Sequence, residues 1–569
     1  MTNNSPTDNA KQPPFTLDPK PEHGVTRKDI WDQFKFFIDV AKKANISEDS
    51  GLSDKIAEAK AKLRWGSYEG ALCYTAARRH PDRLGLVDDD GELTYEQLWE
   101  AANRLARGLW QRGIREGSRV AVLALNGRAS ILPLIARHLV GFNIFMVNAN
   151  ASASQIEHLL EYHEIDGIIL DQEFVERLTE KSRHRLVIVG HVDKPNEMEE
   201  GLITLQDVID SAQVTLELPF RPSKSKHIVM TSGTTGVPKG VVRRIPLSPQ
   251  PAAPVLASIP WHMGMSVILT GVLFHAYGWA QLNMCFLTAS TIVARRHFDA
   301  EQTFKDIDKY KVTAMASAAT PLRALYRYAE ENGIDEVEGM EFIVSSGSPL
   351  APSEIEKCNK LFGRTLCNTY GSTETATLAM AGPEDLAGDP TLSGIVFPGT
   401  RIEIRDEEGN MVPDGESGEI WAGAYDMFLG YTDPSIDIPV NNGLIRMGDR
   451  GIRKGNRLYV QGRADDMVIT ARAEKIFPAE LEKVLIGDPR INDSVVMGVK
   501  DGEFGQALRA YILPEEGEDS ISEEEITTLL RETLSDAHVP RDIIFVDEFP
   551  RNPMGKVLRK QLPGLDSDN

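Results

Sequence analysis

The sequence lacks the features that mark secreted, membrane-spanning or nucleic-acid-binding proteins. Basic residues number 62 against 84 acidic ones, and the net charge of −22 disfavours nucleic acid or an anionic membrane as the main partner. Residues 1–24 are polar and contain proline, so they lack the apolar core of a secretory signal. The four cysteines form no C-x-x-C pair and show no metal-ligand spacing: Cys73, Cys285, Cys358 and Cys367. This pattern fits a reducing cytoplasm.

A second absence is local. Between Ile245 and Ala294 there is no Asp, Glu, Lys or Arg. Five prolines, two histidines and several Gly, Asn and Gln residues interrupt the apolar residues of this stretch. A spanning helix needs about 20 mainly apolar residues in succession, so a transmembrane span is the disfavoured alternative. We expect instead a buried segment that lines a ligand tunnel.

Length and hydrophobic pattern predict an α/β protein with more than one domain. A chain of 569 residues exceeds what one hydrophobic core organises. Short apolar runs such as Arg119–Leu125 alternate with helical patterns such as Ile131–Val140, which is typical of a mainly parallel sheet covered by helices. Thr94–Gln97 has the pattern of a capping box at a helix start. After Tyr370 alternating residues and frequent turns indicate a small antiparallel β-rich subdomain.

We expect three parts along the chain. Residues 1–66 form an N-terminal extension that is partly disordered and partly helical. Residues 67–464 form a large domain of helix-covered mixed or parallel sheets, together with the β-rich subdomain. Residues 465–569 mix strands and helices over a length sufficient for a small α+β domain.

A loop of small residues, 231–240, follows the apolar run Ile228–Met230 and reads Thr-Ser-Gly-Thr-Thr-Gly-Val-Pro-Lys-Gly. Gly233 and Gly236 permit positive φ and close approach of the backbone. Successive N–H groups, hydroxyls and the charge of Lys239 can then form a nest for phosphate. Only two residues separate the two glycines, which excludes a P-loop of the Walker type and disfavours a GTPase or AAA-type ATPase. For the loop alone, a flexible polar turn is the alternative.

Three further positions carry groups suited to nucleotide or acyl chemistry, and each has a plain structural alternative. Asn368–Glu374 offers an aromatic ring, a glycine, hydroxyls and a carboxylate, which could stack a base, approach a phosphate and hold Mg²⁺. Its alternative is a strand-to-helix turn capped by Ser372 or Thr373. Asp449, between glycines, suits either ribose hydroxyls or a tight turn. His275 lies among aromatics, where a histidine is most often a hydrogen-bonded core residue.

Two charged segments follow towards the C-terminus. Gly462-Arg463-Ala-Asp465-Asp466 places an arginine and two carboxylates at the expected domain boundary. Taken alone, it is typical of a solvated linker. Pro550–Val557 presents Lys556 in a loop bracketed by prolines, and a lone lysine of this kind is usually only solvated.

The order of these motifs carries more information than any one of them. The phosphate loop, Tyr-Gly-x-Thr-Glu at Tyr370, Gly-Asp at Asp449, Gly-Arg-x-Asp-Asp at Arg463 and Gly-Lys at Lys556 follow one another along the chain. This order and spacing resemble those of the adenylate-forming superfamily of acyl-CoA synthetases, luciferases and peptide-synthetase adenylation domains. The resemblance runs from about residue 67 to 562. It implies a large AMP-binding domain and a small, mobile C-terminal domain that carries the catalytic lysine.

The resemblance also implies roles for the matching positions. Thr373 would contact the α-phosphate, Glu374 would bind Mg²⁺, and Lys556 would act in adenylation. His275 would lie at the inner wall of the acyl pocket and gate it, and Asp465 would be the hinge. The nucleotide would be bound by Thr231, Ser232, Gly233, Thr234, Thr235, Gly236, Lys239, Gly347, Ser348, Pro349, Asn368, Thr369, Tyr370, Gly371, Thr373, Asp449, Arg463 and Lys556.

The activity that the resemblance implies is ATP-dependent activation of a carboxylic acid to acyl-AMP with release of pyrophosphate, then transfer to coenzyme A. The implied cofactors are ATP, Mg²⁺ and coenzyme A. A homodimer and a peripheral membrane contact stay open. A medium- or long-chain fatty acid is the first expectation for the substrate, an aryl or arylpropenoic acid the second and an amino acid the last. An amino acid comes last because no acidic residue is placed to bind its amine. An alkyl chain or an aromatic ring suits the apolar residues Met263, Met265, Leu269, Val272, Phe274, Tyr277 and Trp279.

Two departures from the family pattern matter for this expectation. Met467–Pro478 is one residue longer than the usual glycine-containing loop and has no glycine, with Ala471-Arg472-Ala473 where the backbone would approach the pantetheine. An enzyme that forms acyl-AMP without using coenzyme A is therefore a second hypothesis, and a non-catalytic acyl-nucleotide-binding protein is a third. Arg243 and Arg244 stand where Ser-His is frequent, and we expect this change to matter little.

Overall fold

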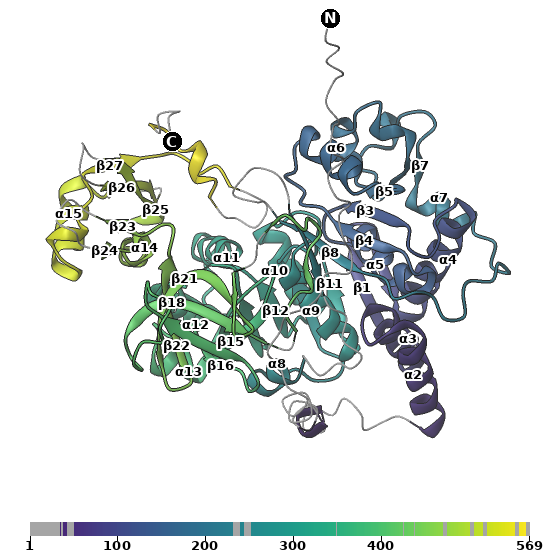
Figure 1. Cartoon of the computed structure of the whole chain (residues 1–569), viewed down its shortest axis with the longest axis horizontal. Coiled ribbons are helices and arrows are strands. Elements are labelled where there is room, and N and C mark those ends of the chain that lie inside the picture. Colours follow the sequence, from purple (N-terminus) through teal and green to yellow (C-terminus); the bar gives the residue numbers. More distant parts are fainter. Residues whose placement is uncertain are drawn as a thin grey trace, which may run out of the picture.

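The computed structural model of the chain describes residues 35, 38–41, 51–231, 239–243, 252–348, 350–424, 426–436, 439–469, 475–500, 506–515, 520–551 and 557–564. It confirms the α/β class, with a large N-terminal part built on two sheets and a small C-terminal part that has a sheet of its own (Figure 1). Within these residues, no helix combines the length and the apolar character that crossing a membrane requires. All four cysteines are buried and free.

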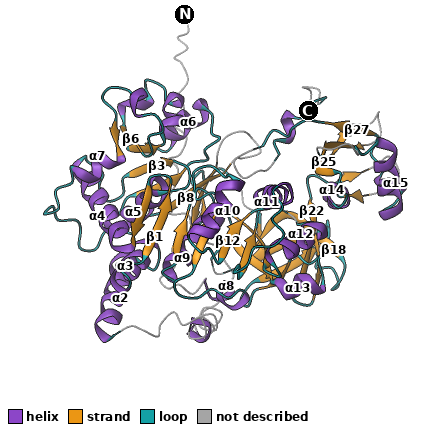
Figure 2. Ribbon diagram, turned by 180° about the vertical axis from the view of Figure 1, so that it is seen from behind, coloured by secondary structure: helices purple, strands orange, loops and turns teal. Residues whose placement is uncertain are grey.

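The first sheet has eight strands. β9 runs antiparallel to both of its neighbours, and the remaining pairs are parallel. Its inner strands are continuous buried apolar runs because helices cover the sheet (Figure 2). In sheet order the strands are β19 (Gly430–Tyr431), β9 (Lys239–Arg243), β8 (His227–Thr231), β4 (Asn143–Met146), β3 (Arg119–Leu123), β5 (Gly167–Leu170), β6 (Leu186–Val189) and β7 (Ile203–Thr204). The helices beside it are α4 (Tyr95–Gln111), α5 (Arg128–Val140), α6 (Ala153–Tyr162) and α7 (Leu205–Asp210).

The second sheet has fourteen strands. It is parallel from β1 to β14 and antiparallel beyond β14, so the expected β-rich subdomain continues this sheet, although its buried residues form a core of their own. The strands in order are β17 (Arg401–Arg405), β18 (Ser417–Gly423), β21 (Leu444–Lys454), β22 (Arg457–Arg463), β16 (Gly394–Val396), β15 (Ala376–Ala381), β14 (Leu366–Ser372), β13 (Phe342–Ser345), β12 (Ala314–Ser317), β10 (Ser266–Leu269), β11 (Thr291–Val293), β1 (Leu84–Asp88) and β2 (Gly91–Thr94), with β20 (Val440–Asn441) beside β21.

Helices complete the large part. The capping box predicted at Thr94 begins α4: the Gln97 N–H donates to Thr94 Oγ1 at 3.2 Å, and Gln97 Oε1 accepts from the Thr94 N–H at 2.8 Å. The remaining helices are α2 (Leu52–Trp65), α3 (Glu69–Arg79), α8 (Ala253–Ser258), α9 (Ala276–Leu287), α10 (Ala300–Lys309), α11 (Ala319–Glu331), α12 (Pro352–Phe362) and α13 (Pro383–Gly388).

The C-terminal part packs around a separate hydrophobic core. Its elements are β23 (Val468–Ile469), β24 (Lys475–Ile476), α14 (Pro478–Ile486), β25 (Ile491–Lys500), β26 (Gln506–Pro514), α15 (Glu523–Thr533) and β27 (Asp542–Phe545). β25, β26 and β27 form a three-stranded sheet that α14 and α15 accompany.

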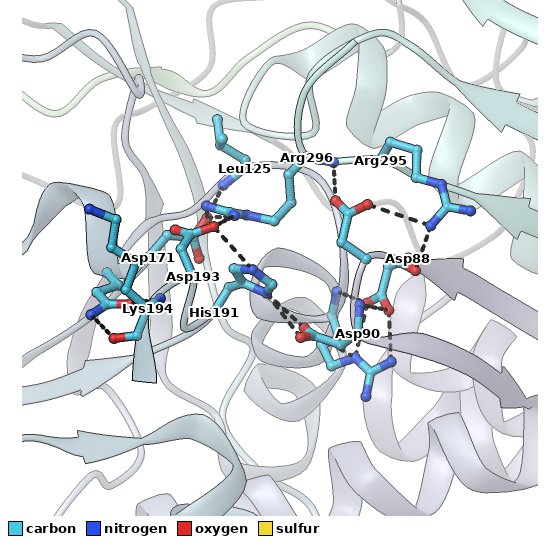
Figure 3. Close-up of polar contacts among 12 residues, drawn as sticks. Asp88, Asp90, Leu125, Asp171, His191, Asp193, Lys194, Arg295 and Arg296 are labelled. Atoms are coloured by element: carbon cyan, nitrogen blue, oxygen red, sulfur yellow. Dashed lines mark hydrogen bonds and ion pairs between the residues drawn. The ribbon is translucent and has the colours of Figure 1, made fainter. Parts of the chain in front are cut away.

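Charged side chains join the two large sheets where β1, β5, β6 and β11 end (Figure 3). Arg296 contributes most, because its guanidinium reaches Asp171 at 3.4 Å, Glu173 at 2.5 Å and also Asp193. His191 Nδ1 lies 3.0 Å from the Asp90 carboxylate. We refer to this set as the sheet junction.

Candidate active site

The predicted phosphate loop connects the two strands of a β-hairpin. β8 and β9 pair in register from His227 with Arg243 to Thr231 with Lys239, so both strands end together at the base of the loop. Thr231 Oγ1 donates to the carbonyl oxygen of Lys239 at 3.3 Å. The structure therefore brings the two ends of the predicted motif together. The other predicted residues of the loop lie outside the described residues: Ser232, Gly233, Thr234, Thr235 and Gly236.

A second hairpin carries the predicted string Asn368–Glu374. β14 ends at Ser372 and β15 begins at Ala376, so the turn joins two strands and the alternative of a strand-to-helix turn is wrong. A Cβ at Gly371 would lie 2.0 Å from the carbonyl oxygen of Ala376, which is why this position needs glycine. The Ser372 hydroxyl accepts two N–H groups of the turn, each at 3.2 Å, and so fixes its shape.

Three predicted nucleotide-binding side chains meet at one point. The Tyr370 hydroxyl donates to Asp449 Oδ2 at 2.7 Å, and Arg463 Nη1 donates to Asp449 Oδ1 at 3.2 Å. Asp449 and Arg463 are direct partners in the ladder between β21 and β22. Burial raises the pKa of the Tyr370 phenol well above its ordinary value, and the Asp449 charge adds to this. An aromatic ring beside a carboxylate and a guanidinium suits a base and the hydroxyls of its ribose.

Gly347 and Ser348 follow β13 at its carboxyl end, the edge at which open α/β sheets bind ligands. Asn368 and Thr369 lie on the adjacent strand, where both are buried. Each donates a hydrogen bond at 3.2 Å to a backbone carbonyl of a neighbouring segment, so both side chains link strands. Pro349 lies outside the described residues.

A cavity of about 250 Å³ lies beside the β14–β15 hairpin. Its polar end consists of Ser346, Gly347, the residues 371–373 and the paired side chains of Arg243 and Asp426, of which Arg243 also donates to the Thr373 carbonyl oxygen. Its apolar end is lined by side chains of α3, α8 and α9 and of the residue before α3: Tyr68, Leu72, Val255, Trp279, Met284 and Leu287. An acid with its carboxylate at the polar end would therefore place its hydrocarbon part between these helices.

The lining corrects part of the sequence-based expectation. Of the predicted apolar residues, Tyr277 and Trp279 line the cavity, and the others do not: Met263, Met265, Leu269, Val272 and Phe274. Leu269 belongs to β10, an inner strand whose side chains enter the sheet core. Tyr68 and Leu72 were missed because no motif marks them, and a helical pattern shows which face is buried without showing what it faces.

His275 lies directly before α9 and on the cavity wall. Burial lowers its pKa to about 4, so the imidazole is neutral near pH 7. Its Nε2 atom has no hydrogen-bond partner among the described residues. These properties agree with the proposed gating position, and the gating role itself remains a prediction.

Glu374 offers one carboxylate at the turn between β14 and β15. Tyr431 donates its hydroxyl hydrogen to Glu374 Oε1 at 3.0 Å. Within the described part of the chain, no group of three or more His, Cys, Asp or Glu side chains is arranged to hold a metal ion. One carboxylate together with substrate phosphates is the usual way in which proteins bind Mg²⁺, so this donor set fits Mg²⁺ bound with a nucleotide.

The remaining predicted positions lie near the C-terminal part. Asp465 follows β22, its side chain is 78% exposed, and it lies 3.9 Å from the Arg463 guanidinium; its role as a hinge remains a prediction. Lys556 and the segment 471–473 lie outside the described residues. Arg551 and Val557 form an antiparallel bridge on either side of the segment that contains Lys556.

Family comparison agrees with this site. Residues 73–432 match the AMP-binding enzyme family, and residues 480–556 match the AMP-binding enzyme C-terminal domain. Because the first match spans more than half of the chain, the chain belongs to the AMP-binding enzyme family. It is therefore an enzyme that combines the two matched units, in the order that the motifs predicted.

Individual relatives cover nearly the whole protein at low identity. A 2-succinylbenzoate–CoA ligase from Bacillus licheniformis is 27% identical, over 85% of this chain and 97% of the relative. The fatty acid–[acyl-carrier-protein] ligase ScoC from Streptomyces coeruleorubidus is 28% identical, over 85% of this chain and 94% of the relative. The crystal structure of the anthranilate CoA ligase AuaEII in complex with anthranoyl-AMP has a TM-score of 0.76 at 22% identity, covering 86% of this chain and 96% of that one. This structural likeness shows the fold alone.

Proposed function

We propose that the enzyme activates a carboxylic acid with ATP, forming acyl-AMP and pyrophosphate, and then transfers the acyl group to coenzyme A. The supporting observation is the cavity, which begins at the predicted nucleotide-binding turn and ends between apolar helices. A carboxylate and an α-phosphate would meet at this polar end. The activity of the relatives, ligation of acids to coenzyme A or to a carrier protein, agrees with this proposal.

The first half-reaction needs alignment and charge stabilisation. A carboxylic acid is ionised at neutral pH, so no general base is required. The carboxylate oxygen attacks the α-phosphorus, and the bond to the pyrophosphate oxygen breaks. Thr373 would donate to the α-phosphate, and Lys239 and Lys556 would stabilise the charge that develops on the phosphate oxygens. A Mg²⁺ ion held by Glu374 and the phosphates would supply further charge neutralisation.

The second half-reaction needs the adenylating lysine to leave the site. The thiol attacks the acyl carbonyl of acyl-AMP, the bond to the phosphate oxygen breaks, and AMP departs with both electrons of that bond. Rotation of the C-terminal part about Asp465 would exchange Lys556 for a thiol channel. The exposure of Asp465 agrees with a hinge at this position.

For the substrate, we propose a medium- or long-chain fatty acid as the first class to test. The mainly apolar wall of the cavity supports it, as does the fatty acid ligase among the relatives. An aryl acid is the second class. Tyr68 and Trp279 form an aromatic pair with ring centroids 5.2 Å apart at the apolar end. The cavity volume of about 250 Å³ lies just below the range of about 300 to 1,000 Å³ typical of small-molecule sites, which favours a compact acid.

The acceptor has an alternative that two observations favour. The segment 471–473 lacks the usual glycines, and one relative is named for transfer to an acyl-carrier protein. An enzyme that forms acyl-AMP and does not use coenzyme A would satisfy both. A non-catalytic acyl-nucleotide-binding protein is the third hypothesis, which the presence of Glu374, Asp449, Arg463 and Lys556 disfavours.

One assay separates these functions. Purified protein, ATP and Mg²⁺ are incubated with fatty acids of increasing chain length and with aryl acids, each with and without coenzyme A. Acyl-AMP, acyl-CoA and AMP are then measured by mass spectrometry. Acyl-CoA from one acid class supports the proposal and identifies the class. Acyl-AMP that accumulates regardless of coenzyme A favours the second hypothesis, and no product from any acid contradicts an activating enzyme.

A further inference from the structure

Arg243 is a buried cation at the end of β9, beside the Thr373–Glu374 turn. It is 1% exposed. Its Nη1 donates to the carbonyl oxygens of Thr373 at 2.6 Å and Glu374 at 3.4 Å, and its Nη2 donates to the Asp426 carbonyl oxygen at 2.8 Å and to its carboxylate at 3.3 Å. Burying a guanidinium is costly unless hydrogen bonds and an opposite charge offset it. Arg243 has both, and two of its bonds fix the turn that carries Glu374.

The neighbouring strand β19 also contacts the Thr373–Glu374 turn. β19 pairs with β9, with Tyr431 opposite Val241. From this strand the Tyr431 hydroxyl donates to the Glu374 carboxylate at 3.0 Å, and just before it the Phe428 N–H donates to the Glu374 carbonyl oxygen at 2.7 Å. The backbone of Glu374 and its carboxylate are therefore both fixed by the β9–β19 pair.

The same strand pair also contacts the base of the phosphate loop. Lys239, the first residue of β9, places its Nζ 5.7 Å from the centroid of the Tyr431 ring. A Cβ at Gly240 would lie 2.5 Å from Thr432 Oγ1, so the two strands approach as closely as a glycine allows. β9 thus begins at the phosphate loop and ends at the turn that bears the proposed metal ligand.

We propose that Arg243 is a positioning residue that, together with Tyr431, holds Glu374 at a fixed place relative to Lys239, at the base of the phosphate loop. The proposal rests on the proposed function, in which Glu374 and the nucleotide phosphates share a Mg²⁺ ion. Mg²⁺ requires near-ideal octahedral geometry, so a carboxylate that shifts against the phosphates loses affinity for the ion. Groups that orient a metal ligand typically change metal affinity or activity by about 10- to 100-fold.

The test uses two variants and one matched control. Arg243→Met keeps most of the side-chain volume and removes all four hydrogen bonds, and Tyr431→Phe removes only the hydroxyl that contacts Glu374. The control is Arg405→Met. Arg405 is also a buried arginine, 3% exposed and paired with Glu403 at 2.6 Å, but it lies on β17 at the far edge of the second sheet.

Two readouts are measured on the full-length protein. Binding of Mn²⁺ in the presence of a non-hydrolysable ATP analogue is followed by electron paramagnetic resonance, which does not require turnover. The Mg²⁺ concentration for half-maximal acyl-AMP formation is measured in parallel. We expect Arg243→Met to weaken Mn²⁺ binding by about tenfold or more and to raise the Mg²⁺ requirement similarly. Tyr431→Phe should shift both in the same direction by a smaller factor, and Arg405→Met should lower the melting temperature without shifting either.

The outcomes separate this inference from the proposed function. Wild-type Mn²⁺ affinity in both Arg243→Met and Tyr431→Phe would overturn the positioning role. If Arg243→Met does not fold, Tyr431→Phe decides, since it removes one oxygen atom only. If the wild-type protein binds Mn²⁺ with the analogue but activates no acid, the proposed function fails while the binding measurement still tests Arg243. If the wild-type protein binds no Mn²⁺ under these conditions, both proposals fall.

Discussion

The sheet junction predicts a stability that depends on pH through one buried carboxyl group. Asp171 is 0% exposed. It accepts a hydrogen bond from the Leu125 N–H at 2.9 Å and lies 3.4 Å from the Arg296 guanidinium (Figure 3). Burial raises its pKa from 3.8 to about 6, although the Leu125 hydrogen bond and the charges of Arg296 and His191 act the other way. The nearby Glu173 adds to the increase.

The direction and size of the effect follow from linkage. Because the folded state binds the Asp171 proton more tightly than the unfolded chain does, the stabilisation is complete below about pH 4 and is lost as the pH rises through about 6. A pKa difference of about 2 corresponds to about 3 kcal/mol in the free energy of unfolding. The hydrogen bond and charge of Asp90 raise the pKa of His191, so His191 adds a loss of the same sign at higher pH. The lowered pKa of Asp90 acts with the opposite sign at lower pH.

Asp171→Asn isolates the contribution of this group. The variant loses the ion pair with Arg296, which shifts its stability, but it also loses the titration between pH 4 and 6. Melting temperatures of both proteins are compared at several values between pH 4.5 and 7.5. Relative to the wild type, we expect the variant to gain about 2 kcal/mol across this range, because part of the effect already lies below pH 4.5, and this is a change on the order of a few degrees for a part of this size.

A matched control shares the same arginine. Asp193 also pairs with Arg296, but its side chain is 38% exposed, so Asp193→Asn shows what the loss of one carboxylate partner of Arg296 does to the melting temperature. Parallel curves for wild-type protein and Asp171→Asn would refute the assignment of a raised pKa to Asp171.

Three further predictions concern the active site. Lys556→Ala should severely reduce acyl-AMP formation and should affect acyl transfer from supplied acyl-AMP less. Equal loss in both half-reactions would contradict the proposal that the C-terminal part takes a different orientation for each of them. Gly371→Ala should abolish adenylation, because its Cβ would lie 2.0 Å from the Ala376 carbonyl oxygen, and full activity would show that the turn can rearrange. Trp279→Ala should enlarge the apolar end of the cavity and shift kcat/KM toward longer or bulkier acids, whereas an unchanged order of substrates would place the acyl group elsewhere.

The fold class and the order of the motifs could be predicted from the sequence because both are local. Buried parallel strands show continuous apolar runs, and the Thr94–Gln97 capping box is a contiguous signal that the structure confirms. The family resemblance assigns Tyr370, Asp449 and Arg463 to one nucleotide, and the structure brings these three side chains into contact, while their binding roles remain predictions. The residues between Tyr370 and Asp449 contain no pattern that predicts the 2.7 Å hydrogen bond between these two side chains.

What the sequence could not predict depends on contacts between distant segments. The turn after Ser372 was ambiguous, since a hydroxyl residue caps helices and closes hairpins alike. The hairpin forms because Gly371 has no Cβ, which allows the Ala376 carbonyl oxygen to approach it closely. Arg243, which stands where Ser-His is frequent in the family, was expected to matter little. Its partners at positions 373, 374 and 426 are more than 120 residues away, so its burial could be seen only in the folded chain.

The polar end of the site also indicates how so acidic a chain can bind a polyanion. A net charge of −22 repels ATP at long range, and two of the predicted ligands are themselves carboxylates. Each of them already has a donor: Asp449 accepts from Arg463, and Glu374 accepts from Tyr431. A nucleotide that binds here adds partners to these groups: ribose hydroxyls approach Asp449 while Arg463 stays, and a cation approaches Glu374 while Tyr431 stays on its Oε1 atom. Because Glu374 and the phosphates are both anionic and need a divalent ion to bridge them, binding of ATP should weaken sharply when Mg²⁺ is removed.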